Sequence, residues 1–188
     1  MLYADGGVMP VVEAGAWVAP DASVVGDVTI ATGARVMYGA RIVAESGGKI
    51  RIGKNCIVME NAVIRATARH DCVIGDHCLI GPQTHVTGAT IEDEVFVATG
   101  ASVFHGATLG RGAEVRINAV VHIRTVVAVG DPAKILPPDQ HDTIWAEQAP
   151  LNFPDWVYGL PRSTPEMMKA ITGRLSGELG GPPPKKSF

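Results

Sequence analysis

The chain has 188 residues, of which 46% are hydrophobic and only 5% aromatic, so it can form one domain with an extension around an aliphatic core. Its formal net charge of -3 comes without a basic stripe, which argues against nucleic acid as a partner. The sequence has no apolar run of about 18 residues and no basic-then-apolar leader at its start. We therefore expect a cytoplasmic protein that does not enter a membrane.

After a lead over residues 1–10, one aliphatic residue recurs every six positions from Val12 to Val127, with short breaks in register. A second column of small or apolar residues lies two positions before the first. Two inward positions in six, one large and one small, are typical of a hexapeptide-repeat β-helix, in which about 18 residues form one triangular coil. The pattern predicts an all-β solenoid of parallel strands over residues 11–136.

The three cysteines, Cys56, Cys72 and Cys78, all fall in the column of small residues. Their odd number and wide spacing argue against a disulfide framework or a zinc knuckle. We expect each of them to be a small buried hydrophobe.

Two insertions, over 43–49 and 65–71, interrupt the repeat. Insertions in a solenoid leave the coil as loops, often on the face that binds ligands.

The residues after 136 depart from the repeat and form an extension over 137–179. Asp139 is placed to cap a short helix over 140–148. Residues 163–179 carry apolar side chains at helical spacing, which predicts a helix packed along the solenoid. The remainder, 180–188, reads as a disordered tail.

Four phrases within residues 11–136 resemble, in order, the γ-class carbonic anhydrase-like family: "VMYGARIVAE", "IRIGKNCIVMENAVIR", "CVIGDHCLIGPQTHVTGATIEDEVFVATGASVFHGATLG" and "VGDPAKIL". The resemblance implies a left-handed parallel β-helix with a C-terminal helix alongside. It also implies a homotrimer with zinc sites between subunits, where one chain supplies two histidines and its neighbour supplies a third.

The positions of those three zinc ligands hold Arg65, Pro82 and Thr87 in this chain. A guanidinium has no lone pair to donate, proline has no ligating side chain, and zinc requires imidazole, thiolate or carboxylate donors. At the other polar positions of the family's motifs, this chain keeps only two acidic side chains, Glu45 and Glu60. We therefore expect no metal at these positions, no other cofactor and no carbonic anhydrase activity of the usual kind.

The six histidines offer no obvious replacement for the lost ligands. His122 lies about two coils beyond Thr87, roughly 9–10 Å at strand spacing, which is too far for a shared ion. His70 and His85 border the cleft that the resemblance implies and are retained as candidates. The others are expected as turn or surface residues: His77, His105 and His141.

Arg65 is the central candidate for binding. We expect an ion pair between Arg65 and Glu60 at the subunit interface, which either holds the trimer together or grips a carboxylate, bicarbonate or phosphate group. Glu60 or His85 could then act as a general base. The candidate catalytic residues are Glu60, Arg65, His70 and His85, and the candidate substrate-binding residues are Arg65, Glu45 and Thr87.

Three functions remain open at this point. The first is a zinc-free trimer that binds or transforms a small anionic molecule between its subunits. The second is a coenzyme A-dependent acyltransferase with His70 as the base, although no basic pocket for the coenzyme's phosphates is evident in the sequence. The third is a noncatalytic structural or assembly trimer.

Overall fold

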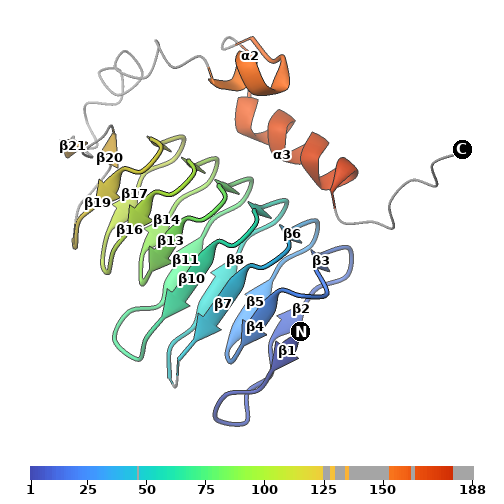
Figure 1. The fold of residues 1–188 in the computed structure, drawn as a ribbon, viewed down its shortest axis with the longest axis vertical. Coiled ribbons are helices and arrows are strands. Elements are labelled where there is room, and N and C mark those ends of the chain that lie inside the picture. The colour runs from blue at the N-terminus through green and yellow to red at the C-terminus, as the bar shows by residue number, and fades with distance from the viewer. Residues whose placement is uncertain (46, 125–127, 130–133, 136–152, 162–163, 180–188) are drawn as a thin grey trace, which may run out of the picture.

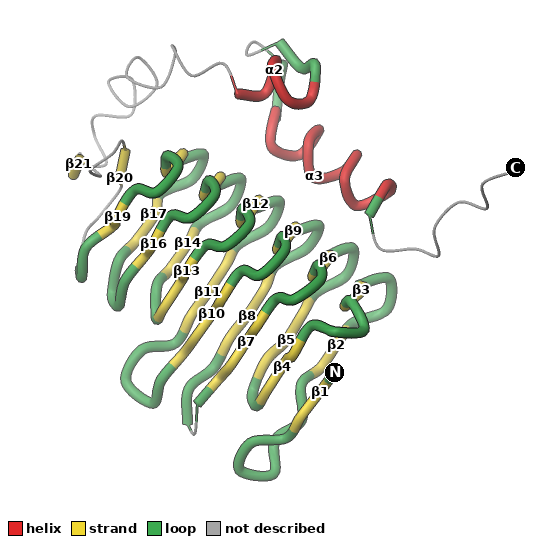
Figure 2. The backbone as a smooth tube through the Cα atoms, in the orientation of Figure 1, coloured by secondary structure: helices red, strands yellow, loops and turns green. Residues whose placement is uncertain are grey.

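The computed structural model describes residues 1–45, 47–124, 128–129, 134–135, 153–161 and 164–179. Short parallel strands stack coil upon coil into a left-handed β-helix with three faces, as the repeat and the resemblance predict (Figure 1). Figure 2 shows the regular alternation of strands and turns along the solenoid. We name its three sheets face A, face B and face C.

Face A carries the candidate site. Its strands lie in the order β1-β4-β7-β10-β13-β16-β19. Residues of the N-terminal lead form β1 and pair with β4. The strands of face A are β1 (Leu2–Tyr3), β4 (Ser23–Val25), β7 (Arg41–Ala44), β10 (Val63–Ala66), β13 (His85–Thr87), β16 (Ser102–Val103) and β19 (Val120–Val121).

Faces B and C each contain six strands within the described residues. Face B consists of β2 (Val11–Val12), β5 (Val28–Ile30), β8 (Ile50–Ile52), β11 (Cys72–Ile74), β14 (Thr90–Ile91) and β17 (Thr108–Leu109). Face C consists of β3 (Trp17–Val18), β6 (Arg35–Val36), β9 (Ile57–Val58), β12 (Leu79–Ile80), β15 (Phe96–Val97) and β18 (Glu114–Val115). A separate antiparallel pair joins β20 (Ala128–Val129) to β21 (Lys134–Ile135).

The core lies inside the three faces and is built from the two inward columns. Ile30, Ile64 and Leu109 from the large column have no exposed surface, and the small column is equally buried. Burying one such aliphatic side chain contributes about 1.5–3 kcal/mol relative to leaving it in water. All three cysteines are buried and free, which confirms their expected role as small hydrophobes.

The C-terminal extension contains α2 (Phe153–Tyr158) and α3 (Met167–Glu178). The helix predicted over 163–179 is confirmed as α3, which packs on face C through a second apolar cluster that includes Met168, Ile171, Ile57 and Leu79. The helix expected over 140–148, its cap Asp139 and the tail at 180–188 lie outside the described residues. Among the helices that the structure describes, none has the length and apolar character needed to cross a bilayer.

Hydrogen bonds also attach α3 to the solenoid. The Nε of Arg35 donates to the carbonyl of Leu179 over 2.8 Å, and the hydroxyl of Ser176 donates to the carbonyl of Gly33 over 2.5 Å. His77, expected at the surface, is half-buried, and its Nδ1 lies 3.1 Å from the hydroxyl of Thr172. Since that hydroxyl donates to the carbonyl of Met168, His77 must donate from Nδ1.

Candidate functional site

The candidate residues gather on face A, where β7, β10 and β13 run side by side. In the strand register, Arg65 on β10 lies between Val43 on β7 and Thr87 on β13. His85, at the start of β13, pairs with Val63 of β10, so it lies diagonally across from Arg65. Side chains alternate along a strand, which places Arg65 and His85 on the outer surface while Ile64 and Val86 fill the core.

Arg65 forms an ion pair with Glu45 through its Nη2. The expected ion pair with Glu60 is therefore wrong. Glu45 directly follows β7 at the edge of face A where Arg65 lies, since Ala44 and Ala66 are paired in register. Glu60 belongs to the turn that precedes β10, at the opposite edge, where its carbonyl accepts from the backbone of Gln83.

The Arg65–Glu45 ion pair is open to solvent, with 44% and 42% of the two side chains exposed. Such a pair contributes only about 0–1 kcal/mol to folding. Within the described residues, Glu45 engages only one end of the guanidinium. The other N–H donors of Arg65 remain available to a ligand.

His85 is half-buried beside Arg65, with its ring centroid 6.2 Å from that of Phe104. Burial lowers the pKa of His85 below its ordinary value, and the nearby charges of Arg65 and His105 lower it further. The neutral imidazole is therefore favoured near pH 7, and it can accept a proton from a bound molecule.

His70 and His105 form a pair that the sequence did not indicate. His70 lies in the loop after β10, where it exchanges two backbone hydrogen bonds of 3.0 Å with Thr67. His105 follows β16, and its ring meets that of His70 edge to face, with centroids 5.3 Å apart. His105 was expected in a turn, and the structure places it in one, where it is half-buried.

The residues at the three family zinc positions do not fit a zinc ion. Arg65 is engaged by Glu45. Thr87 is only 6% exposed, and its hydroxyl has no hydrogen-bond partner among the described residues. Pro82 lines a small cleft of mostly apolar side chains that includes Met59 and Tyr158. In the part of the chain that the structure describes, no three His, Cys, Asp or Glu side chains are grouped to hold a metal.

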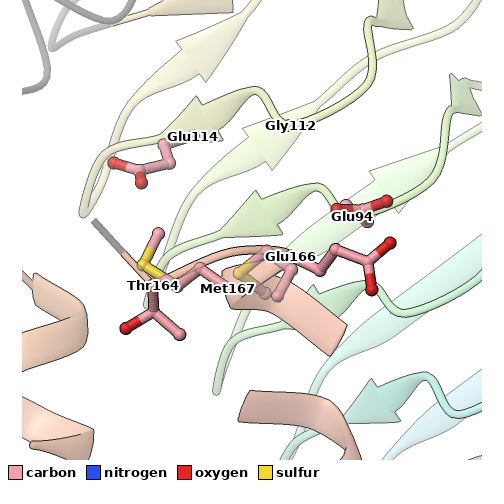
Figure 3. A pocket seen from close by; sticks show the side chains of 7 residues that line it. Glu94, Gly112, Glu114, Thr164, Glu166 and Met167 are labelled. Carbon is pink, nitrogen blue, oxygen red and sulfur yellow. The ribbon is translucent and has the colours of Figure 1, made fainter. Parts of the chain in front are cut away.

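A separate cavity of about 210 Å³ lies between face C and the start of α3 (Figure 3). Glu94 and Glu166 lie on one side of it and Glu114 on the other. Lys169 contacts Glu166 over 2.5 Å, and Arg111 contacts Glu94 over 3.1 Å. With three carboxylates in its lining, this cavity does not suit an anionic ligand.

Two curated relatives resemble about half of the chain. Gamma carbonic anhydrase 1, mitochondrial, from Arabidopsis thaliana is 32% identical over 100 residues, which cover 50% of this chain and 36% of the relative. A probable carbonic anhydrase from Methanocaldococcus jannaschii is 33% identical over 86 residues, covering 46% of this chain and 54% of the relative. The chain thus spans between about a third and about half the length of these relatives. No family model matches it.

Two solved structures share the fold over more of the chain. A hexapeptide transferase family protein from Anaplasma phagocytophilum superposes with a TM-score of 0.64 at 25% identity, covering 79% of this chain and 90% of that one. A putative acetyltransferase from Bacillus cereus superposes with a TM-score of 0.72 at 16% identity, covering 94% of this chain and 93% of that one. The second likeness concerns the fold alone.

Proposed function

Because this chain belongs to the γ-carbonic anhydrase-like family of hexapeptide-repeat β-helix proteins, we propose that it forms a cytoplasmic homotrimer that binds a small anionic molecule beside Arg65. The binding site lies at the contact between subunits, and the protein does not hydrate CO₂. The observation that carries the proposal is the half-exposed guanidinium of Arg65, held by a single carboxylate at a position where the family places a zinc ligand.

The surroundings of Arg65 support an anion in preference to a cation. The guanidinium presents planar N–H donors that match a carboxylate, bicarbonate or phosphate in two-point contact. His85 lies beside it with a lowered pKa, so a neutral imidazole is available as a base. The buried hydroxyl of Thr87, on the neighbouring strand, has no hydrogen-bond partner in the described residues, and Glu45 orients the guanidinium.

Direct binding tests this proposal, with bicarbonate, acetate and inorganic phosphate as probes in isothermal titration calorimetry. Arg65→Ala is expected to abolish the binding that the wild type shows, and Arg65→Lys to weaken it because an ammonium cannot make the two-point contact. Arg51→Ala is the matched control, since Arg51 pairs with Asp27 over 2.8 Å on face B and its side chain is 42% exposed.

Three results would overturn parts of the proposal. Equal anion binding by the wild type and Arg65→Ala removes Arg65 from the site. A monomer mass by light scattering excludes a binding site between subunits. CO₂ hydration by the purified protein, with or without added Zn²⁺, refutes the stated lack of carbonic anhydrase activity.

Acyl transfer from coenzyme A is a second candidate. It is favoured by the likeness to the hexapeptide transferase family protein and by the position of His70 on a loop, where its ring nitrogens have no hydrogen-bond partner among the described residues. Titration with acetyl-coenzyme A separates the two functions. Binding that Arg65→Ala leaves intact supports acyl transfer, and binding of neither anions nor acetyl-coenzyme A supports a noncatalytic trimer.

A further inference from the structure

The pair formed by His70 and His105 joins two loops that belong to different coils. Backbone hydrogen bonds hold both residues in place. His70 is fixed by its two bonds with Thr67, and the carbonyl of His105 accepts from the backbone of Arg124 over 3.1 Å. The two imidazoles therefore start from rigid backbone positions, which limits the entropy lost when a ligand binds between them.

The coil between them makes room for the contact. Gly88 occupies that coil with φ +55°, and a Cβ built on it would lie 2.6 Å from the Cβ of His70 and 3.0 Å from the Cδ2 of His105. The Cβ of His70 cannot move away without its backbone, whereas the ring of His105 can turn aside. A side chain at this position would therefore displace His70 from its contact with His105.

The nitrogen atoms of both rings are open to a ligand. Within the described residues, neither imidazole takes part in a hydrogen bond, and both residues are only half-buried. Buried or half-buried polar atoms normally find a partner, either in the protein or outside it. The pair thus presents four ring nitrogens that have no hydrogen-bond partner in the part of the chain that the structure describes.

The spacing of the rings suits a metal ion. With Zn–N distances of about 2.0–2.1 Å and a tetrahedral angle, two imidazoles on one ion have their centroids about 5 Å apart. The observed separation is 5.3 Å, so the rings reach this geometry by turning out of their edge-to-face contact until one nitrogen of each points at a shared ion. Imidazole is a preferred ligand of Zn²⁺, Ni²⁺ and Cu²⁺.

From these observations we propose that His70 and His105 form a two-histidine chelate for a divalent transition-metal ion, with water completing the coordination. The site is separate from Arg65, Pro82 and Thr87, and it does not rest on the proposed anion binding. The charge of Arg65 on face A is offset by the carboxylate of Glu45, which weakens its repulsion of the ion.

The test uses the full-length protein without a histidine tag, titrated with ZnCl₂ and NiCl₂ in a buffer that does not chelate metals. The wild type is expected to bind one ion per chain. His70→Ala and His105→Ala are expected to weaken binding by at least the tenfold that loss of a supporting ligand contact costs. His122→Ala, which removes the exposed histidine directly after β19 on the same face, is expected to bind as the wild type does.

His105→Phe separates ligation from packing. It keeps an aromatic ring against His70 and removes both nitrogens, so it is expected to fold with an unchanged melting temperature and to lose metal binding. Undetectable metal binding by the wild type overturns the proposal. The proposal is also overturned if the single variants His70→Ala and His105→Phe both bind metal as tightly as the wild type. Neither result bears on the loss of anion binding in Arg65→Ala.

Discussion

The rings of His70 and His105 meet edge to face with centroids 5.3 Å apart, although a complete coil containing Gly88 lies between their backbones. Backbones with one coil between them lie about 9–10 Å apart in a parallel sheet. The side chains must therefore lean toward one another across the middle coil. That arrangement makes Gly88 as important to the pair as either histidine.

Gly88→Ala is expected to lower the free energy of unfolding by about 1–3 kcal/mol for the left-handed backbone alone, and by more because of the contact with His70. Urea denaturation followed by circular dichroism measures the change. The matched control is Gly112→Ala, because Gly112 also has a positive φ, +72°, but no atom within 4 Å of its added Cβ. Equal losses in the two variants would show that the crowding at Gly88 has no energetic consequence.

Arg65→Ala is expected to raise the pKa of His85, because the charge of Arg65 disfavours the imidazolium. An NMR titration of the His85 ring protons measures it. The wild-type pKa lies below the ordinary value of 6.5, so the unfolded chain takes up this proton more readily than the folded protein. The contribution of His85 to stability is therefore fully present above pH 6.5 and is lost as the pH falls through its folded pKa.

The same titration in Arg51→Ala serves as the control for a general change of charge. Arg51 lies on face B and is not among the causes that lower the pKa of His85. An unchanged titration of His85 in Arg65→Ala would show that the charge of Arg65 does not lower the pKa of His85.

Ile171→Ala is expected to loosen α3 from face C. Ile171 has no exposed surface and packs with Ile57 and Leu79, so its truncation costs about 2–4 kcal/mol of the docking free energy. Hydrogen exchange of the α3 amides is expected to accelerate, while the strands of the solenoid keep their protection. Lys169→Ala, which removes ion pairs with Glu166 and Glu94 on the outside of the helix, is expected to cost less than about 1 kcal/mol. Unchanged exchange in Ile171→Ala would mean that α3 is held by other contacts.

Cys72 is expected to resist thiol reagents in the folded protein. Burial raises its pKa to about 12, so almost no thiolate is present at pH 8. Labelling with a chromogenic disulfide at pH 8, with and without urea, measures this reactivity. Rapid modification of Cys72 without urea would contradict its position in the core.

The repeat predicted most of the fold because the inward columns follow a strict period and each coil packs only on its neighbours. The helix α3 could also be predicted from the sequence, since its apolar residues Met168 and Ile171 lie one helical turn apart. The short helix α2 was not predicted, because six residues around Pro154 carry little periodic signal.

The candidate site was harder to predict because it depends on the positions of side chains between coils. The choice between Glu45 and Glu60 as the partner of Arg65 depended on which edge of face A each acid occupies, and the inserted loops hide this register in the sequence. The contact between His70 and His105 depends on the absence of a side chain at Gly88. The only signal that could have found it was the count of coils that places Gly88 between them.

The fixed spacing of the strands also sets the distance between side chains on different coils of the solenoid. One further coil of about 18 residues inserted between Gly88 and His105 would keep every inward column in register. It would also carry His105 about 4.8 Å further from His70, beyond the reach of a shared ligand. Stability in this chain depends on what fills the columns, whereas its chemistry depends on how many coils separate two side chains. The number of coils and the composition of the core can therefore change independently, which allows such a scaffold to gain or lose a site while its fold is retained.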